Sequence, residues 1–509
     1  MTKKYYITTP IYYPNDKPHL GHAYTNICCD ILARFARLKE YDVYFLTGTD
    51  EHGQKLQKAA EKAQITEKEF VDTKVISFLE LNSSLNISND DFIRTTQDRH
   101  IDAVKYLWEY LLAKGYIYKD HYAGWYSVRD ESFYSENELS DNGKAPTGAD
   151  VEWVEEESYF FKLSHFQDKL LDFYHNNPNF IQPISRKNEV LSFIKSGLKD
   201  LSISRTSFTW GISVPNDDKH VIYVWLDALT NYISALGYPY KEGRIQEFWP
   251  TAIHMVGKDI LRFHAIFWPA FLMAADITLP QHIAVHGWWM NKGEKMSKSI
   301  GNVVDPVDIV NKYNADALRY FVAKEMPFGQ DGNFVEQNFQ NRYNSELANK
   351  IGNLLQRTLT LIHKNFDSKI PNIDSIGSID SLYRSSELLK LAEVVYEKID
   401  AALEKYEFHT ALDHILKLAD KANEYIDQLA PWHLVKIDLP KAAEGLYILT
   451  ETCRYIAILL QAFIPSAAEK MLYQLNIDRT MVKFKYLNAS FAITPGAGIN
   501  PIEPIFVRF

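Results

Sequence analysis

The first 60 residues alternate between two hydrophobic periods, and this alternation restricts the fold more than any other feature of the sequence. Residues 5–11 form a β-rich aromatic run, residues 20–39 carry apolar side chains at helical spacing, and residues 43–47 form a second short apolar strand. Residues 48–50 are then expected to open another helix. Strands that alternate with helices in this way predict an α/β protein with a Rossmann-like, doubly wound parallel sheet.

This α/β pattern is interrupted once and is later replaced by a helical one. Short aromatic segments, glycines, prolines and acidic residues mark 116–220, and beyond residue 341 nearly everything has helical periodicity, apart from a loop expected at 367–381. Strand-like runs return at 221–225, 252–256 and 282–286. The expected domains are the first half of a Rossmann-like catalytic domain (1–115), an inserted connective subdomain (116–220), the second half of the catalytic domain (221–290), a linking segment with a basic loop (291–340) and an all-α helical bundle (341–509).

Composition and charge exclude several classes of protein. Hydrophobic residues make up 46% of the 509 residues and aromatic residues 14%, so the chain has ample material for large cores and is not a disordered protein. No window approaches the length of an apolar membrane span, and the N-terminus shows no signal or transit segment, so we expect a cytoplasmic protein without membrane attachment. The net charge of −10 argues against unspecific coating of nucleic acid but allows a local basic groove.

A first motif, His19-Leu20-Gly21-His22, lies between a predicted strand and a predicted helix. A helix N-terminus offers free N–H groups and the positive end of the helix dipole, which suit a phosphate group. Gly21 has no Cβ, so a flat base could pack against the backbone, and the two imidazoles could donate to phosphate oxygens as charge develops. Two surface histidines beside a turn are the alternative interpretation.

A second motif is the run Lys295-Met296-Ser297-Lys298-Ser299, which is flanked by glycines. Its two ammonium groups and two hydroxyls suit a mobile loop that closes over a triphosphate. A solvated basic loop without a ligand is the alternative.

Together and in this order, the two motifs resemble those that class I aminoacyl-tRNA synthetases place around ATP. The residues around them are similar to those of the methionyl-tRNA synthetase family over nearly the whole chain. The matching runs are TPIYYPN (9–15), GTDEHG (48–53), YVWLDA (223–228), GKDI (257–260), FH (263–264) and FWP (267–269). The chain has no room for the large editing insertion of the leucine, isoleucine and valine enzymes.

This resemblance implies the residues of both substrate sites. It implies four catalytic residues, His19, His22, Lys295 and Lys298, and further ATP contacts from Gly21, Met296, Ser297 and Ser299. It implies that Asp50 holds the ammonium group of methionine and that Asp259 supports the pocket or the ribose. The other implied pocket residues are Ile11, Tyr13, Trp225, Leu229, Tyr232, Ile260, His264 and Trp268. An aromatic-lined pocket suits a flexible thioether, although each aromatic taken singly is more often part of a core.

The helical half carries a second set of implied contacts. Asn353 and Arg357 lie four residues apart on one expected helix face, and Trp432 follows another expected helix in the run APW. In the resembling family the matching residues read the CAU anticodon, and RNA loops are typically read by stacking on aromatic rings and by Arg or Asn edge contacts. A tryptophan buried between helices is the alternative.

One departure from the family pattern concerns zinc. Many methionyl-tRNA synthetases carry Cys-ligated zinc knuckles in the inserted subdomain, but residues 121–153 contain no cysteine. The three cysteines of the chain, Cys28, Cys29 and Cys453, allow neither a zinc knuckle nor a disulfide framework, and we expect them to be buried. We therefore expect no metal-binding residues and no structural zinc. The end of the chain resembles the end of the core enzyme without the appended domain that dimerises some relatives, so we expect a monomer.

The leading hypothesis is an enzyme that activates L-methionine with ATP and Mg²⁺ to methionyl-adenylate and passes it to the 3′ end of tRNA(Met), including the initiator tRNA. A catalytically inactive paralogue that binds or regulates tRNA is the first alternative, but it would be expected to lose Asp50, a motif histidine or Lys298. A nucleotidyltransferase acting on a small molecule is the second, but it would have no use for the long helical half.

Lys298→Ala should lower methionine-dependent pyrophosphate exchange by at least about 100-fold and leave methionine binding nearly unchanged. The reason is that a loop ammonium meets phosphate charge mainly in the transition state. Steady-state exchange kinetics check this, and a raised KM for methionine with kcat intact would show that the assigned role is wrong.

Overall fold

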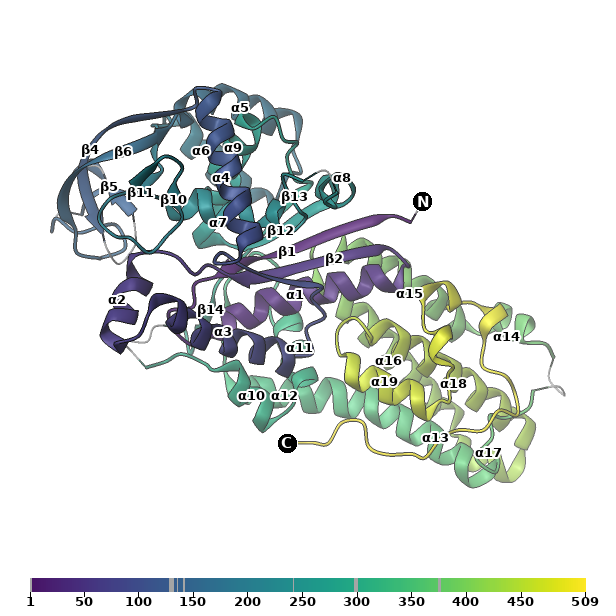
Figure 1. Ribbon diagram of the computed structural model, residues 1–509. Helices are drawn as coiled ribbons and strands as arrows, with labels where there is room; N and C mark the ends of the chain where they lie inside the picture. Colours follow the sequence, from purple (N-terminus) through teal and green to yellow (C-terminus); the bar gives the residue numbers. More distant parts are fainter. Residues whose placement is uncertain are drawn as a thin grey trace.

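Six parallel strands form the sheet that organises the N-terminal half of the chain (Figure 1). The computed structural model describes residues 2–127, 132–134, 136–140, 142–240, 242–296, 301–373 and 377–509. The strand order is β3-β2-β1-β12-β13-β7, and each neighbouring pair is parallel. The strands are β1 (Lys4–Tyr12), β2 (Asp42–Thr49), β3 (Asp91–Arg94), β7 (Ile181–Gln182), β12 (Ala252–Gly257) and β13 (His282–His286). The Rossmann-like sheet expected from the sequence is confirmed.

The sheet separates two hydrophobic cores, because successive residues of a strand point to opposite faces. In β1, Tyr6 belongs to the core that contains α4, α7 and α9, whereas Ile7 belongs to the core that contains α1. Ala252 and Ile253 divide in the same way in β12. Burial on both faces explains why these strands have nearly continuous apolar runs. The helices of this half are α1 (Leu20–Leu38), α2 (Gln54–Ala63), α3 (Glu67–Ser84), α4 (Asp98–Ala113), α7 (Val224–Ser234), α8 (Ile245–Phe248) and α9 (Trp268–Ala274).

The described residues between α4 and α7 form two small antiparallel sheets and two α-helices beside the parallel sheet, and they also supply its edge strand β7 (Figure 1). One sheet has the order β5-β4-β6-β8 and the other β10-β11-β9. Their strands are β4 (Ile117–Ser127), β5 (Ser132–Tyr134), β6 (Glu152–Phe161), β8 (Leu201–Ser202), β9 (Ser204–Arg205), β10 (Ser213–Val214) and β11 (Asp217–Ile222). The helices are α5 (Gln167–Asn176) and α6 (Ile184–Lys195).

A third small sheet, β15-β14-β16, leads into the helical bundle. It consists of β14 (Trp289–Asn291), β15 (Glu294–Lys295) and β16 (Gly332–Phe334). The helices of the second half are α10 (Pro306–Lys312), α11 (Ala315–Lys324), α12 (Glu336–Arg342), a π-helical segment (Tyr343–Gly352), α13 (Asn353–Asn365), α14 (Ile379–Ser385), α15 (Glu387–Leu403), α16 (Phe408–Leu429), α17 (Pro431–Ile437), α18 (Leu439–Leu460) and α19 (Pro465–Gln474). The all-α second half is confirmed. No helix among the described residues is both long and apolar enough to cross a membrane.

The helix expected to open at 48–50 begins at Gln54 instead, because Gly48 still belongs to β2. A Cβ on Gly48 would lie 2.0 Å from the carbonyl oxygen of Ile93 in β3. The glycine therefore allows two strands to approach closely and does not mark a helix start.

The strand expected at 221–225 is also different. It ends at Ile222 as part of β11, which pairs antiparallel with β9 and lies outside the parallel sheet. Helix α7 begins at Val224. The apolar run 221–226 in the sequence crosses this element boundary without a break.

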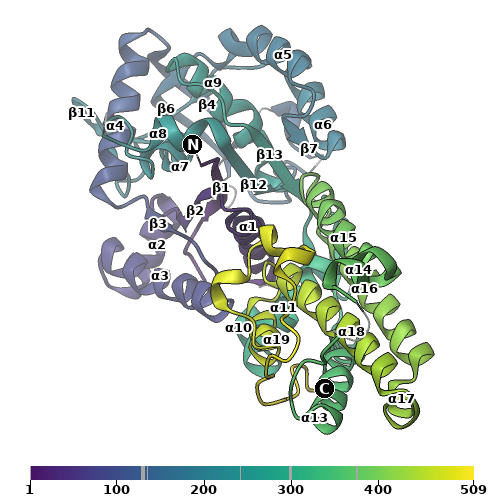
Figure 2. The same cartoon turned by 90° about the vertical axis from the view of Figure 1, so that its right-hand side faces the viewer.

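A buried ion pair joins the N-terminal half to the helices of the second half where α1 meets α11 (Figure 2). Arg319 on α11 and Asp30 on α1 are both fully buried, with Nη1 2.7 Å from Oδ2. The guanidinium also donates to the carbonyl oxygens of Phe463 (2.8 Å), Ala462 (3.0 Å) and Leu85 (3.2 Å). Leu85 precedes α11 in the sequence, whereas Ala462 and Phe463 follow it, so one side chain ties together α1, the end of α3 and the turn before α19.

Asp30→Ala should destabilise the protein by about 3–5 kcal/mol, because it leaves the Arg319 charge buried without its carboxylate. Burial alone would raise the pKa of the Asp30 carboxyl, but Arg319 and Arg34 hold this pKa below its ordinary value. The stabilisation is therefore present above the pKa of the unfolded chain and is lost as the pH falls through the folded pKa. Urea unfolding at neutral and acidic pH measures both effects.

Lys485→Met is the matched control for that substitution. It removes an exposed ion pair, Lys485–Glu40 at 2.7 Å, which also joins the catalytic half to the C-terminal segment. Exposed pairs contribute little, so the unfolding midpoint should stay where it is. Equal shifts in the two variants would contradict the importance of the buried pair.

Candidate active site

A cleft of about 900 Å³ opens at the carboxyl ends of β1 and β12, where the strand order of the parallel sheet reverses. Sheets of this type bind ligands at such a point. Two residues of the inserted segment, Tyr134 and Thr147, also line the cleft. Thirteen of the residues implied by the resemblance line it: Ile11, Tyr13, His19, Gly21, His22, Asp50, Trp225, Leu229, Tyr232, Asp259, Ile260, His264 and Met296.

The two motif histidines form a reciprocal cap at the N-terminus of α1. The backbone N–H of Gly21 donates to Nδ1 of His19 (3.0 Å), and the backbone N–H of His19 donates to Nδ1 of His22 (3.0 Å). The rings stack with their centroids 3.8 Å apart. A Cβ on Gly21 would lie 2.8 Å from Cε1 of His19, so glycine is needed for this arrangement. Both imidazoles are thereby held beside the positive end of a 19-residue helix.

The acidic wall of the cleft follows β2. Asp50 is 7% exposed, and its backbone N–H donates to the carbonyl oxygen of Tyr12 (2.9 Å), which places it beside the end of β1. Ile11 and Tyr13, which flank Tyr12, are half-buried and line the same part of the cleft. A carboxylate next to apolar side chains can bind a cationic group whose neighbour is apolar.

The opposite wall is aromatic and comes from α7 and from a π-helical turn, Phe263–Phe267. The rings of Trp225 and Phe263 stack 3.4 Å apart, and the Tyr232 hydroxyl donates to Nε2 of His264 (2.7 Å). Nδ1 of His264 donates to the carbonyl oxygen of Ile260 (3.0 Å), which fixes the tautomer. Burial lowers the pKa of His264 to about 4, so this imidazole is neutral at physiological pH.

Trp268, which the resemblance assigns to the pocket, is fully buried in a layer behind this wall and does not line the cleft. Its Nε1 donates to Nε2 of His254 (3.3 Å), whose Nδ1 is 2.9 Å from the Thr8 hydroxyl. The His254 ring stacks on Tyr232 with centroids 4.0 Å apart. Trp268 therefore supports the wall through His254 because the π-helical turn brings His264, and not Trp268, to the surface of the cleft.

Asp259 lies at the mouth of the cleft, in the turn after β12. Its Oδ1 accepts a hydrogen bond from Nε1 of Trp288 (3.2 Å). The Lys258 ammonium lies 4.1 Å from the centroid of the Trp288 ring and 2.8 Å from the Asp331 carboxylate. A Cβ on Gly257 would lie 2.5 Å from Oδ1 of Asp259, so the turn needs glycine at that position.

The basic loop is only partly described. Met296 is half-buried and lines the cleft, and the backbone of Lys295 pairs with Met290 between β15 and β14. Ser297, Lys298 and Ser299 lie outside the described residues. The described part of the loop thus starts at the mouth of the cleft.

The three residues expected to bind an anticodon lie together at the end of the helical bundle, where α13 meets α17 (Figure 1). The Arg357 guanidinium lies 5.4 Å from the centroid of the Trp432 ring and forms an ion pair with Asp427 (2.7 Å). Trp432 is 37% exposed, so it is not a core residue, and Asn353 is exposed one helical turn before Arg357.

Within the described ranges, neither metal-binding side chains nor thiols form a second candidate functional site. No cluster of three or more His, Cys, Asp or Glu side chains there could hold a metal ion. Residues 128–131, 135 and 141, within the cysteine-free segment 121–153, lie outside those ranges. Cys28, Cys29 and Cys453 are buried, and burial raises the pKa of each thiol.

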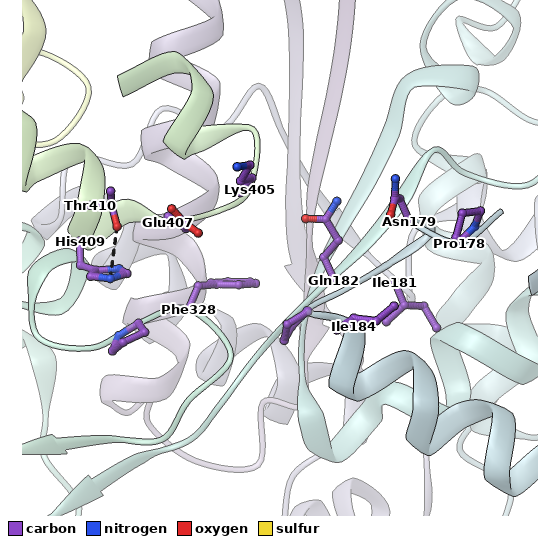
Figure 3. A pocket seen from close by; sticks show the side chains of 12 residues that line it. Pro178, Asn179, Ile181, Gln182, Ile184, Phe328, Lys405, Glu407, His409 and Thr410 are labelled. Atoms are coloured by element: carbon purple, nitrogen blue, oxygen red, sulfur yellow. Dashed lines mark hydrogen bonds between the residues drawn. The ribbon is translucent and has the colours of Figure 1, made fainter. Parts of the chain in front are cut away.

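A second hollow of about 580 Å³ lies between the two halves of the chain (Figure 3). Ile181 and Ile184 line it from the catalytic half, and Phe328, Lys405 and His409 line it from the linking segment and the bundle. It contains none of the residues implied for either substrate. The cleft at β1 and β12 is therefore the candidate active site.

Comparison with known families agrees with this choice. The chain matches the family model for tRNA synthetases class I (M) over residues 5–147 and 137–359, so its cleft is that of a class I aminoacyl-tRNA synthetase. The model for the anticodon binding domain of methionyl tRNA ligase matches residues 382–509. The chain is 56% identical to the methionine–tRNA ligase of Rickettsia felis and 49% identical to that of Brucella suis, with 100% of this chain and 99% and 98% of those proteins covered. The chain belongs to the methionyl-tRNA synthetase family.

Solved structures give the same result. The chain superposes with a TM-score of 0.95 on Mycobacterium tuberculosis methionyl-tRNA synthetase in complex with methionyl-adenylate, at 45% identity and full coverage of both chains. The apo form of that enzyme gives a TM-score of 0.88 at 42% identity, with 100% of this chain and 99% of that chain covered.

Sequence reasoning missed several residues of the site. His254 and Phe263 form the supporting layer and the stacked face of the aromatic wall, and Trp288 holds Asp259. A lone histidine inside the apolar strand 252–256 is a signal for the first of these. Tyr134 and Thr147 could not be found in this way, because the fold of the inserted segment decides which of its residues reach the cleft.

Gly21→Ala should lower the rate of adenylate formation by about 10-fold or more without lowering the melting temperature. The new Cβ displaces the His19 ring from His22, whereas alanine is a better helix former than glycine by up to about 1 kcal/mol. Pyrophosphate exchange and thermal unfolding on one preparation check this. A loss of activity that only follows a loss of stability would contradict it.

Proposed function

We propose that the chain is a methionine–tRNA ligase that carries out both half-reactions in the cleft at β1 and β12. Methionine and ATP form methionyl-adenylate and pyrophosphate, and the methionyl group is then transferred to the 3′ end of tRNA(Met), including the initiator tRNA. The pairing of one buried carboxylate, Asp50, with a facing aromatic wall is the observation that carries this proposal.

Methionine is proposed to lie between these two walls. Its ammonium group binds Asp50, and its thioether contacts Trp225, Leu229 and Tyr232, because sulfur makes favourable contacts with aromatic rings. Neutral His264, held by Tyr232 and the Ile260 carbonyl, offers no charge to the apolar side chain of the substrate. Ile11, Tyr13 and Ile260 complete the proposed pocket. Trp268 supports it from behind.

ATP is proposed to lie over the N-terminus of α1, with Gly21, Met296, Ser297 and Ser299 as further contacts. The methionine carboxylate is already a nucleophile, so attack on the α-phosphate needs no general base. His19, His22, Lys295 and Lys298 stabilise the charge that develops on the phosphate oxygens. Magnesium enters as part of the MgATP substrate, and Asp259 supports the pocket or the ribose. We expect no structural zinc.

The helical half is proposed to select the tRNA. An indole that is 37% exposed beneath a guanidinium suits stacking on a splayed anticodon base, with edge contacts from Arg357 and Asn353. We propose a monomer that acts in the cytoplasm. The family match, the motif histidines and Asp50 together favour an active enzyme over an inactive tRNA-binding paralogue.

Pyrophosphate exchange with each amino acid in turn tests the proposed reaction, and Asp50→Asn tests the proposed site. Only methionine should support rapid exchange.

Asp50→Asn keeps the size of the side chain but removes the charge that faces the ammonium. The methionine KM should therefore rise by about 100-fold, which corresponds to a charge-assisted hydrogen bond of roughly 3 kcal/mol. The KM for ATP should change little, and an equal rise in both would contradict the assignment.

Trp432→Ala should separate the two half-reactions. Removing the indole should cost about 1–3 kcal/mol of tRNA binding and lower the aminoacylation kcat/KM for tRNA by about 10- to 100-fold, with adenylate formation almost unchanged. Arg357→Ala should act in the same direction, and the double variant should be non-additive because the two side chains are in contact. Pyrophosphate exchange, tRNA charging and thermal stability are measured together. Equal losses in the first two assays would rule out the anticodon role.

A further inference from the structure

A buried carboxylate behind the aromatic wall joins three elements of the catalytic half. Asp227 on α7 is fully buried, and its Oδ2 accepts from Nδ1 of His52 while its Oδ1 accepts from Nε2 of His100, both at 2.7 Å. Nδ1 of His100 lies 3.0 Å from the Ser234 hydroxyl. Asp227 and Ser234 are seven residues apart and so share one face of α7. This face holds α4 through His100, whereas the cleft-lining residues Trp225, Leu229 and Tyr232 lie on the opposite side of α7.

The histidine at the other end of this bridge belongs to the acidic wall. His52 follows Asp50 by two residues, and the residue between them, Glu51, is fully buried with its carboxylate held by Arg94 (2.6 and 2.9 Å). The indole N–H of Trp210 donates to the backbone oxygen of Glu51 (2.5 Å). The chain directly after Asp50 is thus fixed at two points, at Glu51 to the end of β3 and at His52 to α7.

We propose that Asp227 is a positioning residue for amino-acid recognition. Through His52 it sets the distance between the Asp50 carboxylate and the wall of α7 that carries Trp225. The inference rests on the proposed binding of the methionine ammonium by Asp50. A misplacement of about 1 Å in a site of this kind can change rates by about 100-fold. The two short hydrogen bonds of Asp227 can therefore have a large effect on substrate recognition.

The burial and the negative charge of Asp227 agree with this positioning role. Burial alone would raise the pKa of the Asp227 carboxyl, but His52 and His100 hold this pKa at about 2. Asp227 is therefore an anion whose two oxygens are both occupied by imidazole N–H groups. Removing the carboxylate leaves two buried donors without their acceptor, whereas an amide of the same shape can keep both hydrogen bonds.

Asp227→Asn is the conservative variant because the amide of asparagine can keep both hydrogen bonds. Its amide oxygen can accept from His52, and its NH₂ group can donate to His100 if that ring moves its proton to Nδ1. The Ser234 hydroxyl can then accept from Nδ1, since a hydroxyl both donates and accepts. Asp227→Asn should thus keep the geometry that Asp227→Ala destroys.

The test compares methionine with 4-(methylthio)butanoate, the analogue that lacks the ammonium group, by equilibrium binding to the full chain. Asp227→Ala and His52→Ala should raise the methionine Kd by about 10- to 100-fold and the Kd of the analogue by less than about 3-fold, since only methionine uses Asp50. Asp227→Asn should stay within about 3-fold of the wild type for both ligands. Thr230→Val is the matched control, because Thr230 is fully buried on α7 and its hydroxyl donates only within the helix, to Leu226 (2.6 Å).

The outcomes separate the inference from the function on which it rests. If Asp50→Asn leaves the methionine Kd unchanged, the proposed ammonium site is wrong. If Asp50→Asn weakens methionine but neither Asp227→Ala nor His52→Ala does so, only the positioning role is wrong. Equal weakening of methionine and the analogue, together with a lowered melting temperature, would show a merely structural carboxylate. If Asp227→Ala does not fold, His52→Ala decides, because His52 is at the edge of the bridge and is 5% exposed.

Discussion

The buried pair between Asp30 and Arg319 is the contact on which the geometry of the whole chain depends. Asp30 lies near the middle of α1, the helix whose N-terminus carries His19 and His22. Arg319 lies on α11, within the linking segment, and also holds the turn before α19. Because both groups are fully buried, neither can move away without exposing a charge to an apolar core. This helix is thus fixed to the helical half at its centre, while its N-terminus lines the cleft.

The cleft divides charge between its two walls. One wall carries the Asp50 carboxylate, and the other carries neutral His264 and the rings stacked around Trp225 and Tyr232. A substrate with one cationic and one apolar end meets complementary surroundings at both ends. The neutral state of His264 follows from its burial, and its orientation from the hydrogen bonds to Tyr232 and Ile260, so the apolar character of this wall persists over the physiological pH range.

Much of this site could be predicted from the sequence, because the two motifs and the runs around them are local. The reciprocal cap of His19 and His22 needs only four consecutive residues and a strand before them. The supporting layer could not be predicted, since Trp268 and His264 lie four residues apart in one apolar run, and only a π-helical turn decides which of them reaches the cleft. The hydrogen bond between His52 and Asp227 joins residues 175 positions apart, so no local sequence pattern predicts it. The end of β11 at Ile222 likewise depends on pairing with β9 and has no local signal in the sequence.

The acidic net charge of the chain is compatible with tRNA as a partner because the proposed contact uses few charges and uses them locally. The Arg357 guanidinium is held above the Trp432 ring by Asp427, whose side chain is 63% exposed. An exposed ion pair of this kind is weak, so it can orient the guanidinium in the free protein and yield to an RNA group at little cost. Pro431 starts α17 directly after Ala430, whose left-handed conformation (φ 45°) ends α16, so the turn between the two helices sets the position of the indole. A rigid aromatic surface with a loosely held cation suits recognition of unstacked bases better than a strongly basic surface would, since phosphate attraction alone does not distinguish one anticodon from another.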